Sequence, residues 1–147
     1  MNAPQTPDDA IRFFYQSLRD FNFHFCWNMF SNNTQKEFLK WTLNDIYTRH
    51  PKAAKEVKIG PPEVKLMFEG NDQSLIQTFW RRFVQKSSAA DFTQYAYYST
   101  IDHKGKSATV QAKLVYPNGK VSTVDLTMVH ERGGWKYAYA ESGLPFT

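Results

Sequence analysis

The sequence predicts an α+β fold in which N-terminal helices pack on a curved four-stranded antiparallel sheet and form a cone. Two observations carry this prediction. Apolar residues recur at helical spacing over residues 6–87, whereas apolar and polar residues alternate between three turn signals over residues 93–141. A chain of 147 residues can bury a sizeable core, so we interpret residues 1–147 as one domain with a helical part and a sheet part.

Capping residues mark the start of the first helices. Thr6 stands before Pro7 and suits the N-cap of a first helix, whose core-facing apolar stripe is Ile11, Phe14, Leu18 and Phe21. Residues 23–30 stay apolar at helical spacing and predict a second short helix or a bent continuation of the first. The polar run 31–34 can cap a third helix, which ends before Pro51.

The middle of the chain carries weaker signals. Residues 52–56 predict one further helical turn, and residues 60–62 predict a loop. The alternation of Val64, Leu66 and Phe68 with polar or flexible neighbours indicates a short strand. Residues 70–72 then open another helix, and its predicted buried stripe is Leu75, Ile76, Phe79 and Phe83.

Three turn signals, at residues 102–105, 117–119 and 131–134, divide residues 93–141 into four strands of a meander. A three-residue loop at 117–119 pairs Leu114 with Ser122 and Ala112 with Val124, which keeps the apolar set on one face. A two-residue loop would split that set. A turn at Lys104-Gly105 predicts Ile101 opposite Ala108, and a two- or four-residue loop at the third turn predicts His130 opposite Trp135. Together the turns predict an inner face made of Tyr95, Tyr97, Ser99, Ile101, Ala108, Val110, Ala112, Leu114, Val124, Leu126, Met128, His130, Trp135, Tyr137 and Tyr139.

Helices followed by such a meander resemble the nuclear transport factor 2-like superfamily, a cystatin-like α+β cone, and its bacterial members in particular. The local patterns are residues 25–31 (FCWNMFS), which lead to Thr34-Gln35, and residues 132–136 (RGGWK) of the last hairpin. The resemblance implies a cone with helices at its mouth and the concave sheet as its wall. It also implies a range of functions, from ketosteroid isomerases and polyketide cyclases to transport adaptors and ligand-binding proteins, and frequent dimers through the sheet.

The residues argue against the enzymatic members of that family. The resemblance implies a carboxylate base on the inner wall, but Asp102 and Asp125 fall on the predicted outer face. A one-residue slip at 117–119 would turn Asp125 inward. We therefore assign no catalytic residue and predict a non-enzymatic small-ligand-binding or protein-interaction domain. The alternative is a cofactor-free isomerase, dehydratase or cyclase acting on a hydrophobic carbonyl compound.

Aromatic residues make up 16% of the chain, which favours either a well-filled core or an aromatic-lined cavity without a cofactor. A cavity of this kind would take a small hydrophobic or aromatic ligand. The candidate pocket residues are Phe14, Trp27, Tyr95, Tyr97, Ser99, Met128, His130, Trp135, Tyr137 and Tyr139.

The predicted outer face of the sheet mixes valine, threonine and tyrosine with few charges. A fully solvated face usually carries more charge, so we expect a homodimer through this face. The candidate dimer-face residues are Tyr98, Val115, Val121, Thr123, Thr127 and Val129.

Charge and cysteine content exclude other classes. The net charge is +4 with the basic residues spread along the chain, densest at Arg81-Arg82, so nucleic-acid binding is not expected. The single Cys26 forms no intramolecular disulfide, and the four histidines show no metal spacing. No apolar run approaches the ~18 residues of a membrane span, and residues 1–7 do not read as a signal peptide. We expect a cytoplasmic protein, or a cell-envelope protein if an export signal has been removed.

Overall fold

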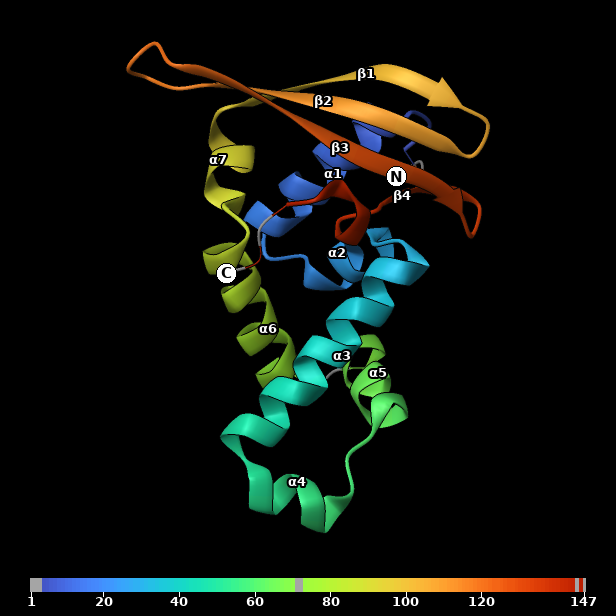
Figure 1. Cartoon of the computed structure of the whole chain (residues 1–147), viewed down its shortest axis with the longest axis vertical. Helices are drawn as coiled ribbons and strands as arrows, with labels where there is room; N and C mark the ends of the chain where they lie inside the picture. The colour runs from blue at the N-terminus through green and yellow to red at the C-terminus, as the bar shows by residue number, and fades with distance from the viewer. Residues whose placement is uncertain (1–3, 71–72, 145, 147) are drawn as a thin grey trace.

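The α+β prediction is confirmed by the computed structural model, which describes residues 4–70, 73–144 and 146 of the chain. Figure 1 shows the helices on one face of the sheet, tapering away from it toward α4. The strands follow one another in the order β1-β2-β3-β4, an antiparallel meander. The elements in the described ranges are α1 (Pro7–Arg19), α2 (Phe23–Met29), α3 (Asn32–Arg49), α4 (Pro51–Val57), α5 (Pro61–Glu69), α6 (Gln73–Lys86), α7 (Ala89–Gln94), β1 (Ala96–Lys104), β2 (Ser107–Val115), β3 (Val121–Glu131), β4 (Gly134–Tyr137) and a 3-10 turn, η1 (Ala140–Ser142).

The predicted caps of the first and third helices are confirmed. The Thr6 hydroxyl accepts the N–H of Asp9 at 3.3 Å, and the Ser31 hydroxyl accepts the N–H of Thr34 at 3.1 Å. Each bond satisfies one of the backbone donors that a helix start leaves without a partner. α2 is a separate short helix, as one of the two predicted alternatives had it.

The predicted strand around Val64 is wrong, because residues 61–69 form helix α5. Pro61 takes the first helical position, and the Glu63 carboxylate accepts the Gly60 N–H at 3.2 Å. Val64 and Phe68, four residues apart, are buried on one side of α5, whereas Leu66 is 67% exposed. Of the three alternating apolar residues that indicated a strand, only Val64 and Phe68 are therefore buried.

The helical part ends with two elements around residue 88. α6 was expected, but Asn71 and Asp72 at its predicted start, and the side chain of Leu75, lie outside what the structure describes. The short helix α7 was not predicted; it follows Ser88, which has a positive φ of 56°. None of the described helices is both long and apolar enough to cross a lipid bilayer.

The predicted registers of the second and third hairpins are confirmed. Leu114 lies opposite Ser122 and Ala112 opposite Val124, and the Tyr116 N–H donates to the Lys120 carbonyl at 2.9 Å across the turn. In the third hairpin, His130 lies opposite Trp135. β4 ends at Tyr137, four residues earlier than expected, because the chain then turns into η1.

The predicted register of β1 is wrong for two reasons. The turn is at residues 105–106, so β1 extends to Lys104 and His103, rather than Ile101, lies opposite Ala108. The strand also contains a β-bulge at Ile101. Pairing runs from Thr100 opposite Val110 directly to Asp102 opposite Thr109. One extra residue reverses which side chains face the helices on the far side of the bulge. Tyr98 therefore lies on the covered face, whereas Tyr97 and Ser99 lie on the outer face.

Aromatic rings fill the space between the sheet and the helices. The Phe14 ring lies 5.1 Å from Tyr137 and 5.2 Å from Phe30, measured between ring centroids. Trp27 of α2 stacks on Phe68 of α5 at 4.1 Å. These contacts join α1, α2, α5 and β4 into one core.

The free edge of β1 is occupied by side chains of α1. The Arg12 guanidinium donates to the Tyr98 carbonyl at 2.6 Å, and the Thr100 hydroxyl donates to the Asp8 carboxylate at 2.9 Å. An edge strand normally presents unpaired backbone groups to solvent. Here α1 and the bulge at Ile101 interrupt that row.

Candidate ligand-binding groove

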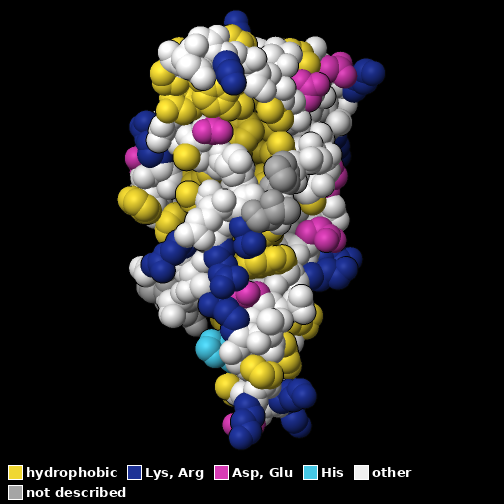
Figure 2. Space-filling view, turned by 60° about the vertical axis from the view of Figure 1, so that its left-hand side comes forward, with side chains coloured by type: hydrophobic (Ala, Val, Ile, Leu, Met, Phe, Trp, Pro, Cys, Tyr) yellow, Lys and Arg dark blue, Asp and Glu magenta, His cyan; other side chains and the backbone are white. Residues whose placement is uncertain are grey.

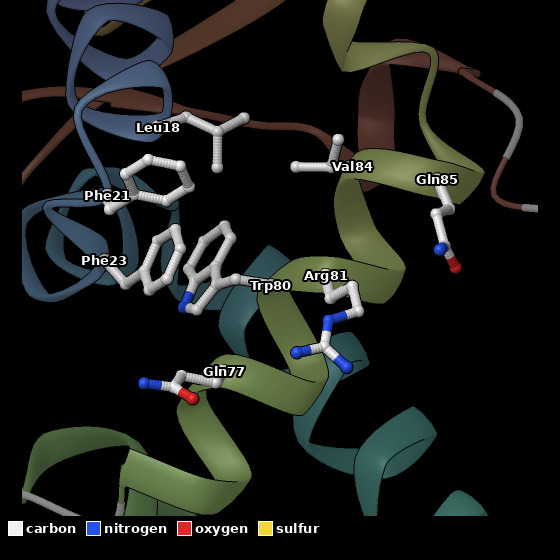
Figure 3. A pocket seen from close by; sticks show the side chains of 8 residues that line it. All are labelled: Leu18, Phe21, Phe23, Gln77, Trp80, Arg81, Val84 and Gln85. Carbon is white, nitrogen blue, oxygen red and sulfur yellow. The ribbon is translucent and has the colours of Figure 1, made fainter.

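A surface groove of about 490 Å³ lies between the end of α1, the start of α2 and the outer side of α6. Its volume is within the range of roughly 300–1,000 Å³ that is typical of small-molecule sites. Figure 3 shows Phe21 and Phe23 on one side, with Trp80 and Val84 of α6 across from them. The complete lining is Leu18, Phe21, Phe23, Gln77, Trp80, Arg81, Val84 and Gln85.

Helix α6 gives the groove an apolar row beside a polar row. Trp80 and Val84 are four residues apart, and Gln77, Arg81 and Gln85 form a second series with the same spacing. Residues four apart share one helix face, so the two rows run side by side along the helix. The floor is therefore apolar and one rim is polar, as Figure 3 shows.

The apolar floor is continuous with the core because its aromatic rings stack on core rings. The Phe23 ring stacks on Trp80 with 5.7 Å between centroids and 11° between planes. Trp80 is 1% exposed and also stacks on Phe30 at 5.6 Å. Val84, by contrast, is 39% exposed at the groove surface.

Phe21 stands at the groove in a backbone conformation that usually belongs to glycine. It follows the C-cap of α1 with a φ of 62°, and its N–H donates to the Leu18 carbonyl at 3.2 Å. The Asn22 N–H donates to the Ser17 carbonyl at 2.8 Å, which completes a Schellman motif. A left-handed conformation costs about 1–2 kcal/mol for a residue with a Cβ. Phe21 nevertheless presents a ring that is 77% exposed.

The two adjacent arginines of α6 differ in whether their charge is paired with an acidic side chain of the described residues. Arg82 forms an ion pair with Asp45 at 2.8 Å and lies over the Trp41 ring at 5.9 Å. Arg81 is exposed and makes no ion pair or hydrogen bond with any residue that the structure describes. The same holds, within the described ranges, for the side chains of Gln77 and Gln85. The polar rim is therefore available to a ligand.

The predicted pocket residues divide into a buried and an accessible set. Phe14, Trp27, Met128, Trp135, Tyr137 and Tyr139 are buried in the core. Five of them, all except Tyr139, line neither this groove nor three further surface hollows, which lie beside Tyr97, Trp41 and His24. This packing matches the filled core that the aromatic content also allowed, and a ligand role for these residues stays a prediction.

Two buried tyrosines of this core share a hydrogen bond. The hydroxyls of Tyr15 and Tyr137 lie 2.9 Å apart. Burial, as the largest cause, raises the pKa of both hydroxyls well above the ordinary value. Both groups therefore stay protonated at neutral pH and hold α1 against β4.

The remaining pocket candidates lie near or beyond the edges of the covered face. Tyr97 is 70% exposed on the outer face and Ser99 is exposed beside it, so their predicted inward orientation is wrong. The cause is the bulge at Ile101. Tyr95 precedes β1 and its ring contacts Tyr116 at 5.3 Å. His130 is exposed at the end of the third hairpin and its ring packs against Trp135.

Most residues of the predicted dimer face lie on the outer face of the sheet. Val115, Val121 and Thr123 are exposed on the outer face, and Thr127 and Val129 are half-buried there. Tyr98 does not belong to it, because its ring stacks on Tyr15 at 6.2 Å and its hydroxyl donates to the Phe92 carbonyl at 2.7 Å. The same bulge explains this error.

Titratable groups do not gather at the groove. Asp125 lies opposite Gln111 and Asp102 opposite Thr109, so both carboxylates are on the outer face as predicted. Cys26 is fully buried, its thiol contacts the Phe14 carbonyl, and burial raises its pKa, which fits the predicted role of a small apolar residue. In the described ranges, no three histidine, cysteine or acidic residues converge as metal ligands.

The sequence indicated several residues of the groove but not that they lie side by side. Leu18 and Phe23 were placed on apolar helical stripes, and Arg81 was noted only as part of the densest basic spot. The approach of α6 to the α1–α2 junction depends on tertiary packing. The predicted place of Phe21 on the buried stripe of the first helix is wrong, because α1 ends at Arg19 and Phe21, after the C-cap, is 77% exposed.

Comparison of the chain with protein-family models, curated proteins and solved structures gives no significant match.

Proposed function

We propose that this protein is a non-enzymatic binding protein that holds a small hydrophobic or aromatic ligand in the groove between the α1–α2 junction and α6. The observation that carries the proposal is Phe21, an exposed ring held at a strained position beside the stacked pair Phe23 and Trp80. Backbone strain of this kind concentrates at functional sites. A ligand in the groove would cover apolar surface that is otherwise in contact with water.

The proposal is tested with phenylnaphthylamine, a neutral aromatic probe whose fluorescence rises in apolar surroundings. We expect saturable binding to the wild-type protein. Val84→Trp fills the groove and should weaken binding by about tenfold or more. Val57→Trp, at a valine that is 70% exposed on α4, is the matched control and should bind as the wild type does. Absence of saturable binding, or equal affinity in both variants, would contradict the proposal.

We also propose that the chain forms a homodimer through the outer face of the sheet. This face carries exposed Tyr97, Ile101 and Val121, and no described helix covers it (Figure 1). Lys113 and Asp125 are exposed there on neighbouring strands, and neither has an ion-pair partner within the described part of the chain. Opposite charges on one face allow a second copy to pair Lys113 with Asp125 across a two-fold axis.

A family placement accompanies these proposals. The succession of helices and a four-stranded meander supports membership of the nuclear transport factor 2-like superfamily, whose members often associate through the sheet. The absence of Asp and Glu from the described positions on the covered face of the sheet supports binding over the isomerase or cyclase alternative.

A further inference from the structure

We propose that the ligand of the groove is an amphipathic monoanion, with a flat apolar body against Phe21, Phe23 and Val84 and one carboxylate or sulfonate group held by Arg81. This inference rests on the proposed function, because it names the chemical class of the molecule that the groove takes. It concerns the polar rim, whereas the proposed function depends on the apolar floor.

The charge of the groove is positive and locally uncompensated. Arg81 is the only charged residue among the eight described residues of the lining, which include no Asp or Glu. Figure 2 shows lysine and arginine side chains gathered over the helical part of the molecule, whereas hydrophobic side chains gather closer to the sheet. Opposite charge on a ligand would therefore be attracted to this rim.

The geometry of the rim fits a planar acid group. A guanidinium donates two parallel hydrogen bonds to one carboxylate, which fixes the direction of the ligand as well as its charge. Gln77 and Gln85 lie one helical turn to either side of Arg81, about 6 Å along the axis, and their amides can donate further hydrogen bonds. Figure 3 places the guanidinium beside Trp80, so the head group and the apolar body would be adjacent.

A single cation sets the charge of the ligand. One guanidinium flanked by two neutral amides neutralises one negative charge, whereas a dianionic phosphate would keep an uncompensated charge at the rim. Arg82 does not add a second cation, because the Asp45 carboxylate accepts its hydrogen bond at 2.8 Å. The site is therefore matched to a monoanion rather than to a nucleotide.

Two probes with the same aromatic skeleton separate this inference from the proposed function. Anilinonaphthalene sulfonate carries the anionic group, and phenylnaphthylamine lacks it. We expect the wild-type protein to bind the sulfonate about tenfold more tightly than the neutral probe. Arg81→Met should remove this preference and leave the affinity for the neutral probe within about twofold of the wild type.

Lys86→Met serves as the control, because Lys86 is a cation of the same helix outside the groove lining. It should keep the preference for the sulfonate. Equal binding of both probes by the wild type, or a preference that survives Arg81→Met, would overturn the monoanion inference and leave the proposed function standing. Absence of binding by either probe would overturn both.

Discussion

The backbone N–H of Asn22 donates to the carbonyl of Ser17 at 2.8 Å, and this bond turns the chain between α1 and α2 sharply enough to place Phe21 in the left-handed region. The motif normally uses glycine at that position because glycine has no Cβ to clash. The sequence has a large aromatic residue there instead, and its ring forms part of the groove wall. A glycine at position 21 would therefore favour the stability of the fold, whereas the ring of Phe21 favours binding of a ligand.

Substitutions of Phe21 distinguish the effect of its backbone strain on stability from the effect of its ring on ligand binding. Phe21→Gly should raise the free energy of unfolding by about 0.5–1 kcal/mol, since relief of backbone strain outweighs the extra freedom of the unfolded chain. It should also weaken binding of the neutral probe, because the ring is lost. Phe21→Ala is the matched control: it loses the ring but keeps the strain, so it should bind weakly without any gain in stability. Urea unfolding and probe titration measure both effects, and tight binding by Phe21→Gly would refute the assignment.

Two buried threonines of α3 provide a second test, of hydrogen bonding in the core. The Thr42 hydroxyl is buried and has no hydrogen-bond partner among the described residues. Thr42→Val keeps the shape and removes the unsatisfied group, so the free energy of unfolding should rise by about 1 kcal/mol.

Thr34 is the comparison site, because its hydroxyl accepts the Ser31 hydroxyl at 2.9 Å and the Ala140 N–H at 3.1 Å. Thr34→Val should lower the free energy of unfolding by about 1–3 kcal/mol, since both donors lose their acceptor. Denaturant melts of the two variants should move in opposite directions. A loss of stability in Thr42→Val would show that its hydroxyl has a role in the fold.

Charge reversal tests the two-fold pairing on the outer face. Asp125→Lys alone, or Lys113→Asp alone, would place like charges together and should weaken the dimer more than about tenfold. The double variant restores opposite charges across the axis and should recover the dimer. Sedimentation velocity at micromolar concentration measures the association, with Glu56→Lys on α4 as an off-face control. A monomeric wild type, or a double variant weaker than both single ones, would exclude this pairing.

The sheet shows how far sequence reasoning reaches. The register of β2 and β3 could be predicted from the sequence. Pro117 and Gly119 suit a three-residue loop, and only that loop keeps the apolar side chains on one face of the sheet. At Ile101 no comparable signal marks the extra residue, since a bulge depends on contacts of the folded edge. The two errors at Tyr97 and Tyr98 both follow from this one residue.

The candidate groove was less accessible to prediction than the fold. Phe23 and Trp80 are 57 positions apart in the sequence, and their stacking is decided by how α2 and α6 pack. The error in α5 has a local cause: with Val64, Leu66 and Phe68 all apolar, a short segment fits a strand and a helix equally well. The proline pair before it and Glu63 favour the helix start.

The contact of Arg12 with the Tyr98 carbonyl has a consequence for how copies of this chain can assemble. A bare strand edge lets each added molecule offer another bare edge, and such growth has no natural end. With α1 side chains on that edge and a bulge in the strand, β1 is a poor template for a strand of another copy, which agrees with the proposed association through the outer face. The proposed association through a face related by a two-fold axis would bury that face on both copies, so assembly would end at two copies instead of continuing as a fibre.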